Sequence, residues 1–420
     1  MYEKTTFPNG LRLLTSSMPQ TRSVSISFYF GAGSRYETPV QAGISHFLEH
    51  ILFKGTAKRP RPEDVSGAIE NLGGIHNAST DRELTVYWCK VARPHFTIGM
   101  DVLQDMIQHS LFQPEEIEKE RKVIIEELNA VQDSPPELAG LLIDQTMWPD
   151  QPLGRDVGGT RESVGGITRD MMMDYMSRQY GPDNVVVSVA GDVTHQEVVD
   201  ILDAGIADWK PGKPTPYIPA VSGQSGPRVS LINRKTEQAH LCLALPGISS
   251  FHPDRYVLSM LSTAFGEGST SRLFLEVRER RGLAYDVHSF PVHYLDTGSF
   301  SVYAGVDPKN AQETIKVVID QLLALREGLS EAELSKVREL AKGRMLLRME
   351  DTRAVASWMG GQEVLLGSVK TVDEVVEQLD RVTVDDVRRV ARDLIDPQCL
   401  NLAVVGPFRS DKPFYRLLKG

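Results

Sequence analysis

Apolar and polar positions follow two different periods along the chain. Val24–Phe30 alternates residue by residue and Val185–Gly191 is almost wholly apolar, which predicts strands with at least one buried face. Pro114–Asp133 and Glu331–Asp351 instead repeat apolar residues every three or four positions, which predicts amphipathic helices. Strands that alternate with long helices indicate an α+β fold, in which we expect mainly antiparallel sheets packed against helices.

The pattern of the first half returns in the second half. Thr168–Gly191 aligns without a gap on Thr383–Gly406, 215 residues later, as a helical segment, a turn with proline and a strand that ends at glycine. Within one residue of the same offset, Leu84–Tyr87 falls on Phe300–Tyr303. Matches that share one offset indicate an internal duplication, so the two halves are expected to have the same fold.

A proline-rich stretch, Lys210–Pro219, separates these halves. Proline cannot extend a helix or a central strand, so this stretch is interpreted as a linker. A chain of 420 residues is also longer than one hydrophobic core usually serves. We therefore expect a domain at residues 1–210, a linker at 211–227 and a homologous domain at 228–420.

Composition narrows the class of protein. The net charge is −10 and no segment concentrates Lys and Arg, so nucleic acid is not an expected partner. The first twenty residues resemble no secretory or transit signal, and no run of about eighteen apolar residues predicts a membrane span. Cys89, Cys242 and Cys399 are far apart in apolar runs, which predicts core thiols in a reducing compartment. These features favour a cytoplasmic protein.

The candidate chemistry begins at His46-Phe47-Leu48-Glu49-His50. Residues four apart share one face of a helix, so the imidazoles of His46 and His50 can reach one ion. Zinc takes neutral imidazoles and a third protein ligand and keeps one position for water. A carboxylate beside that water, here Glu49, can accept its proton. A pattern this short also arises by chance, so a third ligand decides the interpretation.

The helix predicted at Pro114–Asp133 offers that ligand. Glu120 and Glu127 are seven residues apart on its apolar stripe, whereas Glu126 falls on its polar side. A carboxylate on a buried face is costly unless it is paired or bound to metal. Glu127 is therefore the preferred ligand, with Glu120 as support, although both could be ordinary paired or solvated acids without the histidines.

The second half lacks the polar residues of this motif. At the same offset, Leu261, Ala264 and Phe265 stand where the first half has His46, Glu49 and His50. A fold shared by both halves does not require the polar triplet, which argues against a purely structural role for it.

Taken together, these motifs resemble the inverted-motif zinc peptidases related to pitrilysin and insulin-degrading enzyme. The similarity extends over nearly the whole chain and is strongest to the half-length branch that includes the β subunit of mitochondrial processing peptidase and its bacterial relatives. The segments that carry it, besides the motif itself, are Gly33, Gly43-Ile44-Ser45, Phe53-Lys54-Gly55-Thr56, Leu72–Ala78, Glu120 with Glu127, and Ser271-Arg272-Leu273-Phe274.

The resemblance implies an endopeptidase that cleaves short or extended, unfolded peptides with metal-activated water. It implies one zinc ion per chain, held by His46, His50 and Glu127, with Glu49 as the catalytic base and Glu120 in a supporting catalytic role. Residues 1–210 would then be the catalytic domain. The main alternative is a non-catalytic peptide-binding or scaffold subunit, as occurs in relatives without the zinc motif.

The resemblance also implies two substrate-binding elements. A strand with Gly74, His76, Asn77 and Ala78 would receive the substrate backbone by strand addition. Composition alone would favour a plain turn and strand there.

Arg278 and Tyr285 are similar to the family's Arg/Tyr pair, which would hydrogen-bond the scissile carbonyl. The residues alone would favour a solvated basic helix end and a core tyrosine.

One chain thus carries both the zinc motif and the Arg/Tyr pair. This suggests a homodimer in which the second domain of each chain faces the zinc site of its partner. The run Phe265–Ser271 is short and lacks the long glycine-rich loop of the processing peptidase's non-catalytic subunit, so presequence specificity of that kind is not expected.

Overall fold

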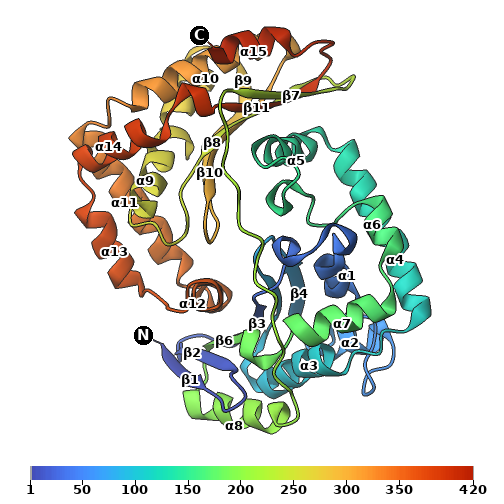
Figure 1. Cartoon of the computed structure of the whole chain (residues 1–420). Helices are drawn as coiled ribbons and strands as arrows, with labels where there is room; N and C mark the ends of the chain where they lie inside the picture. Colours follow the sequence, from blue (N-terminus) through green and yellow to red (C-terminus); the bar gives the residue numbers. More distant parts are fainter. Residues whose placement is uncertain (1, 420) are drawn as a thin grey trace. The chain divides into compact units, whose positions relative to one another are not determined.

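The computed structural model describes residues 2–419. Its contacts divide the chain into two compact units, each with one sheet and its own set of helices (Figure 1). The first unit comprises the chain up to Leu128, Asp156–Ile218 and Leu346–Thr371. The second comprises Asn129–Arg155, Pro219–Met345 and the chain from Val372.

The sheet of the first unit has the strand order β1-β2-β6-β3-β5-β4. Its neighbours pair antiparallel except β2 and β6, which are parallel. The strands are β1 (Glu3–Thr6), β2 (Arg12–Ser17), β3 (Ser23–Phe30), β4 (Ile75–Thr80), β5 (Thr85–Ala92) and β6 (Val185–Gly191).

The sheet of the second unit has the order β7-β11-β8-β10-β9, again with one parallel pair, β7 and β11. Its strands are β7 (Arg228–Asn233), β8 (Ala239–Pro246), β9 (Ala284–His293), β10 (Gly298–Val306) and β11 (Asn401–Gly406). Strand for strand, this order repeats β2-β6-β3-β5-β4. The predicted α+β fold with two similar, mainly antiparallel halves is therefore confirmed.

Helices occupy the connections between strands. The first unit contains α1 (Ile44–Ile51), α2 (Pro62–Glu70), α3 (Phe96–His109), α6 (Arg161–Gly166), α7 (Arg169–Gln179), α8 (His195–Ile206) and α12 (Thr352–Leu366). The second contains α5 (Pro135–Met147), α9 (Arg255–Gly266), η6 (Phe274–Arg280), α10 (Ala311–Leu325), α13 (Val372–Arg381), α14 (Val384–Leu394) and α15 (Lys412–Lys419). The boundary between the units falls within α4 (Pro114–Asp133) and α11 (Glu331–Arg348).

Helix α4 has the bounds that the sequence predicts, whereas α11 ends at Arg348, before the predicted Asp351. The difference has a local cause. The side chain of Asp351 accepts a hydrogen bond from the backbone N–H of Ala354 and so caps the start of α12 instead.

Each sheet is covered on one face by a helix from the other half of the chain. Helix α12, drawn in orange-red, packs on the first sheet, where Ala356 and Met359 join Tyr29 of β3 in one apolar cluster (Figure 1). Helix α5 packs in the same way on the second sheet, where Leu142 and Cys242 belong to one apolar cluster. Neither unit is therefore one continuous stretch of sequence.

The other face of the first sheet carries the main core of that unit. Phe28 of β3 points into this core, whereas the next residue, Tyr29, points to α12, because side chains alternate along a strand. The core also includes Phe47 and Leu48 of α1, which fix the helix that carries the motif.

The proline-rich stretch belongs to the first unit as far as Ile218. The guanidinium of Arg35 stacks on Tyr217 at 4.5 Å from the ring centre, and its Nε donates to the carbonyl of Ile218 at 3.1 Å. Arg35 is itself fully buried and forms an ion pair with Glu83. The start of the predicted linker is thus attached to the first unit.

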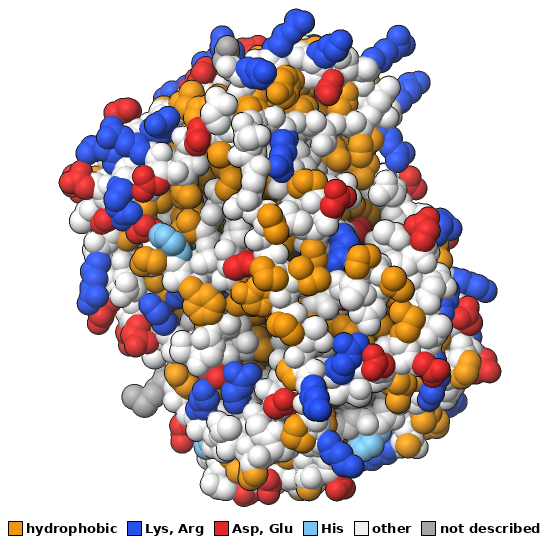
Figure 2. Space-filling view, in the orientation of Figure 1, with side chains coloured by type: hydrophobic (Ala, Val, Ile, Leu, Met, Phe, Trp, Pro, Cys, Tyr) orange, Lys and Arg blue, Asp and Glu red, His pale blue; other side chains and the backbone are white. Residues whose placement is uncertain are grey.

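Three expectations from composition can be compared with the structure. Cys89 and Cys242 are buried as predicted, but Cys399 is only half-buried, because it ends a short helical turn before β11. Among residues 2–419, no helix is long and apolar enough to cross a membrane. On the face shown in Figure 2, basic and acidic side chains are interspersed, in keeping with the charge distribution of the sequence.

Candidate active site

Helix α1 begins at a position that only glycine occupies without strain. Gly43 has a φ of 92°, and a side chain there would lie 2.4 Å from the carbonyl oxygen of Gly158. The carboxylate of Glu37 accepts hydrogen bonds from the backbone N–H groups of Gly43 and Ser45, at 2.8 and 2.9 Å. A buried carboxylate thus caps the helix and complements the positive end of its dipole.

The next turns of α1 and the middle of α4 bring three metal-ligand groups together. The Oε2 atom of Glu127 lies 3.8 Å from Nε2 of His46 and 3.5 Å from Nε2 of His50. All three ligand atoms lie within 4.8 Å of one another. Tetrahedral ligands about 2.0–2.2 Å from zinc are themselves roughly 3.3–3.6 Å apart, so these residues fit a zinc ion after small side-chain adjustments.

The exposure of Glu127 differs from the prediction. Its side chain is 48% exposed, whereas that of Glu120 is 8% exposed, so only Glu120 lies on the buried face of α4. The stripe of apolar residues points into the core, and Glu127 lies at its margin. A ligand at the margin of a core can be reached by water and by substrate, which a fully buried carboxylate could not be.

The two histidines are suited to metal binding for different reasons. Burial, with the neighbouring His50 as a smaller cause, lowers the pKa of His46 to about 4, so its imidazole is neutral at pH 7. The other ring nitrogen of His50, Nδ1, lies 3.0 Å from Oε2 of Glu120. A carboxylate on the second nitrogen of a ligating histidine orients the ring and raises its basicity.

Glu120 is stabilised as a carboxylate on both oxygens. Burial raises its pKa, but the hydrogen bonds from His50 and from Lys54 outweigh burial, so the pKa of Glu120 is lowered. Lys54 Nζ lies 2.8 Å from its second oxygen. Glu120 is therefore an anionic acceptor for His50 and not a candidate proton donor.

Glu49 lies in a different environment. It is half-buried, and this burial raises its pKa, partly offset by a hydrogen bond of 2.6 Å from the hydroxyl of Thr80. Thr80 is the last residue of β4, so the strand and the helix hold this carboxylate between them. A carboxylate with a raised pKa is a better proton acceptor than one in water.

The strand beside this carboxylate has an open edge. In the described part of the chain, β4 pairs with β5 on one side only. The backbone N–H of Ala78 donates a hydrogen bond of 2.8 Å to the side-chain oxygen of Asn77 and not to a neighbouring strand. Gly74 lies just before the strand, where a side chain would meet Ile69 at 2.8 Å. β4 can therefore receive a further strand.

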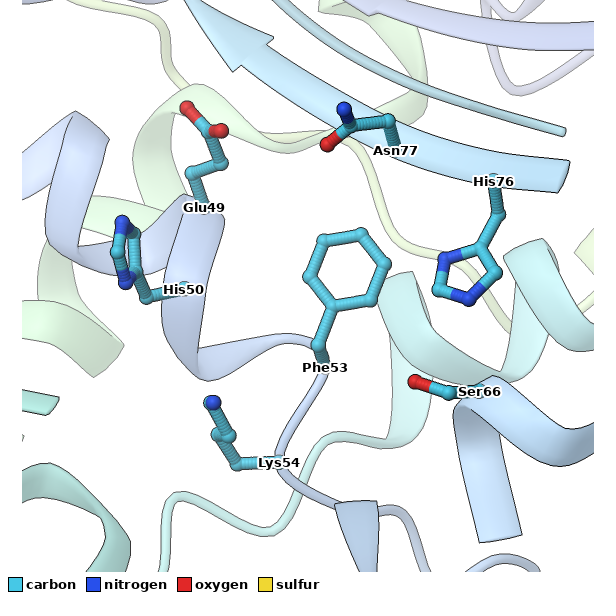
Figure 3. A pocket seen from close by; sticks show the side chains of 7 residues that line it. All are labelled: Glu49, His50, Phe53, Lys54, Ser66, His76 and Asn77. Carbon is cyan, nitrogen blue, oxygen red and sulfur yellow. The ribbon is translucent and has the colours of Figure 1, made fainter. Parts of the chain in front are cut away.

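Between α1 and β4 lies a cavity of about 260 Å³. Figure 3 shows the ring of Phe53 in its centre, with Glu49 and His50 on one side and His76 with Ser66 on the other. The cavity thus joins the predicted base to the predicted substrate strand, and every residue that lines it belongs to the first unit.

Arg278 and Tyr285 lie in the second unit, at the end of η6 and the start of β9. Arg278 donates to the backbone carbonyl of Tyr285 at 2.9 Å, and its guanidinium lies 4.6 Å from the Tyr285 ring centre and 4.8 Å from that of Phe274. Tyr285 is 76% exposed, so it is not a core tyrosine. Segment η6 is a π-helix, a conformation that is rare and concentrates at functional sites.

The start of this π-helix is anchored. Arg272 makes a two-point ion pair with Glu333, at 2.9 and 3.1 Å. Glu333 also accepts hydrogen bonds from Ser330 at the start of α11. These contacts, the bond from Arg272 first, outweigh burial and lower the pKa of Glu333 to about 2.

In the second unit the counterparts of the motif are apolar and buried. Leu261, Ala264 and Phe265 lie on α9, the helix that corresponds to α1. The two halves therefore share the helix but not its polar side chains.

Several residues of the site were not predicted from the sequence. Thr80 and Asp156 are far from the motif in sequence, whereas Glu37 lies only nine residues before His46, but no spacing rule connects any of the three with it. A side chain on Gly158 would lie 3.6 Å from Nδ1 of His46 and 3.4 Å from the carboxylate of Asp156. The sequence does offer one signal that the backbone lies close to His46 here. Gly158 is followed by a second glycine and then by Thr160, the residue that caps α6.

Comparison with known proteins places both halves in one family. Residues 12–161 match the family model described as insulinase (peptidase family M16), and residues 166–340 match the one described as peptidase M16 inactive domain. The chain is 38% identical to an uncharacterized zinc protease of Streptomyces coelicolor, over 99% of this chain and 91% of that protein. It is 36% identical to one of Bacillus subtilis, over 97% of this chain and 98% of that protein.

Solved structures show the same fold. A protease from Helicobacter pylori has a TM-score of 0.92 at 24% identity, covering 97% of this chain and 99% of that one. A peptidase M16 inactive domain from Pseudomonas fluorescens has a TM-score of 0.89 at 18% identity, with the same coverage.

The names of the sequence relatives support a peptidase role and zinc as the metal. Matches over both halves, with relatives at 36 and 38% identity over nearly their full length, show that the chain belongs to peptidase family M16, as a half-length, pitrilysin-type member.

Proposed function

We propose that this protein is a zinc-dependent endopeptidase that cleaves short or extended peptides. The observation that carries the proposal is the convergence of His46, His50 and Glu127 within 4.8 Å, beside a half-buried Glu49. Glu120 accepts a hydrogen bond from Nδ1 of His50 and so fixes the orientation of its ring. The proposed stoichiometry is one zinc ion per chain.

The chain's own residues have distinct tasks in this reaction. When bound, zinc would lower the pKa of a water molecule and polarise the scissile carbonyl. Glu49 takes up the proton of the attacking water and later gives it to the leaving amine. Thr80 holds the Glu49 carboxylate in place through its 2.6 Å hydrogen bond.

The substrate is proposed to bind as an added strand along β4. Main-chain hydrogen bonds to the open edge would hold an extended peptide and would replace the bond that Asn77 now makes to the N–H of Ala78. Gly74 and His76 belong to the same binding strand and its turn. This mode requires an unfolded segment, so folded proteins are expected to be poor substrates.

Arg278 and Tyr285 are proposed to contact the substrate near the scissile carbonyl. The exposed phenol and the guanidinium are both hydrogen-bond donors that can stabilise a developing oxyanion. We further propose a homodimer in which this pair serves the zinc site of the partner chain.

Replacing Glu49 with Gln tests the enzymatic proposal. Because the amide cannot accept a proton, turnover of an unstructured peptide should fall at least about a hundredfold, while bound zinc stays at the wild-type level. Glu126→Gln, an exposed change on the same helix as Glu127, is the matched control. Wild-type turnover by the Glu49→Gln protein would exclude this residue as the base. Inactivity of the zinc-loaded wild type would favour a peptide-binding or scaffold role.

A further inference from the structure

We infer that His76 makes the cavity beside Glu49 a subsite for a substrate side chain that ends in a hydrogen-bond donor. The side chain would belong to one of the two residues that flank the cleaved bond. This inference rests on the proposed peptidase function and specifies its substrate.

The position of the cavity limits what can enter it. It is lined at one end by Glu49 and His50 and at the other by His76 and Asn77 of β4 (Figure 3). A peptide added to β4 with its scissile bond beside Glu49 directs a neighbouring side chain into this space, because side chains alternate along a strand.

His76 is a polar group of the cavity with unused bonding capacity. Its side chain is 12% exposed, and within residues 2–419 neither ring nitrogen makes a hydrogen bond. Nε2 is buried, and Oε1 of Glu70 lies 3.6 Å from it. Burial also lowers the pKa of His76, so the imidazole is neutral at pH 7.

The two ring nitrogens of a neutral imidazole have opposite roles. A carboxylate such as Glu70 can only accept, so the proton belongs on Nε2, which faces it. Nδ1 is then an acceptor with a free lone pair. Figure 3 shows one ring nitrogen of His76 turned toward Phe53 and the other toward Ser66; the one toward Phe53 adjoins the ring carbon that carries the side chain and is therefore Nδ1.

The other walls define the rest of the side chain. Phe53 stacks on His76, with ring centres 5.4 Å apart, and offers an apolar surface for a flat or long side chain. A volume of about 260 Å³ exceeds the needs of serine or threonine. Lys54 and Glu49 line the cavity as well, and Lys54 is paired with Glu120, so charge alone does not select the side chain. Tyrosine and glutamine meet the conditions of size and of a terminal donor.

Two other polar groups of the cavity are already engaged. Lys54 is paired with Glu120 at 2.8 Å, and the side-chain oxygen of Asn77 accepts from the backbone of Ala78. Ser66 is the remaining hydroxyl, and it provides the control below.

Matched peptides test the inference on the zinc-loaded full-length protein. One set differs only in Tyr or Phe at each position flanking the cleaved bond, and a second only in Gln or Met. Wild-type protein should have a kcat/KM about three- to tenfold higher for Tyr and Gln at one position, the worth of one net hydrogen bond. In His76→Phe, which keeps the ring and removes the acceptor, both ratios should fall to about one.

Two further variants separate hydrogen bonding from packing. The oxygen of Asn in His76→Asn can occupy the place of Nδ1 and should restore part of the preference, whereas Ser66→Ala should keep all of it. Equal ratios in wild type and His76→Phe, or no preference at either position in wild type, would overturn the inference. If wild type cleaves no peptide, the proposed function fails instead, and the same Tyr-to-Phe ratio measured as binding by fluorescence anisotropy decides the subsite.

Discussion

The reactivity of Glu49 depends on its immediate neighbours. Burial raises the pKa of this carboxyl, and the hydroxyl of Thr80 holds one oxygen at 2.6 Å. A base that is free to rotate would spend less time in the orientation that accepts a proton. Thr80 is therefore a positioning residue, which acts through Glu49.

Replacing Thr80 with Val keeps the shape of the side chain and removes this hydrogen bond. We expect kcat to fall about three- to tenfold with little change in KM, the effect of one hydrogen bond lost near the reacting group. Thr80→Ser retains the hydroxyl and should retain most of kcat. Steady-state kinetics on an unstructured peptide measure both. A change in KM alone, or an equal loss in the serine variant, would contradict the positioning role.

Individual residues were predictable where a spacing rule connects them. His46 and His50 share a helix face, and Glu120 and Glu127 share another, so periodicity was enough to pair them. Periodicity could not predict that Glu127 is 48% exposed, because the position of the core margin depends on what packs against α4. Thr80 was missed because only the tertiary fold brings it to α1. Glu37 was missed because no spacing rule predicts that the short loop between Glu37 and Gly43 turns its carboxylate back to the first turn of the helix.

Helix α1 depends on the carboxylate that caps it. Glu37 is buried and accepts two backbone N–H groups at the first turn, so contacts within the protein hold the start of this helix. The cap lies one turn from His46, the first of the proposed ligands. A well-ordered α1 therefore also holds His46 in position for the metal.

Replacing Glu37 with Gln should destabilise α1. The amide keeps the size of the side chain but accepts with one oxygen only, so the loss of a charged hydrogen bond costs about 1–3 kcal/mol. We expect a lower Tm in the metal-free protein and weaker zinc binding in a chelator competition. Glu162→Gln, an exposed acidic residue at the start of α6, is the control. Unchanged Tm and zinc affinity in Glu37→Gln would show that the cap is dispensable.

At the element scale the duplication was the most informative signal. Thr168 and Thr383 both cap helices that lead into matching strands, as the 215-residue offset predicts. The crossing of α5 and α12 to the sheet of the other half was not predictable. An amphipathic helix shows that it has a buried face, but its sequence does not specify which sheet that face covers.

For the molecule as a whole, the proposed homodimer decides which chain supplies Arg278 and Tyr285. The proposed homodimer requires that they act on the zinc site of the partner. Two variants that are each inactive can then restore activity together, because a mixed dimer contains one complete site.

Mixing Glu49→Gln with Arg278→Ala tests this arrangement. After subunit exchange in equal amounts, about a quarter of the wild-type activity should return, since half of the dimers are mixed and each has one complete site. Activity that stays at the level of the separate variants, with mixed dimers demonstrated by differential tags, would mean that each chain completes its own site. A monomer by light scattering would also exclude the proposal.

The central claim is that two histidines of α1 and a carboxylate of α4 hold one zinc ion. The most direct measurement is the zinc content and zinc affinity of purified wild type, Glu127→Gln and Glu126→Gln, by elemental analysis and chelator competition. We predict one zinc per chain in wild type and in Glu126→Gln. In Glu127→Gln the zinc affinity should be at least about a hundredfold weaker, because the loss of a metal ligand should cost more than the loss of a residue that only hydrogen-bonds to a ligand. Full occupancy and wild-type affinity in Glu127→Gln would contradict the account.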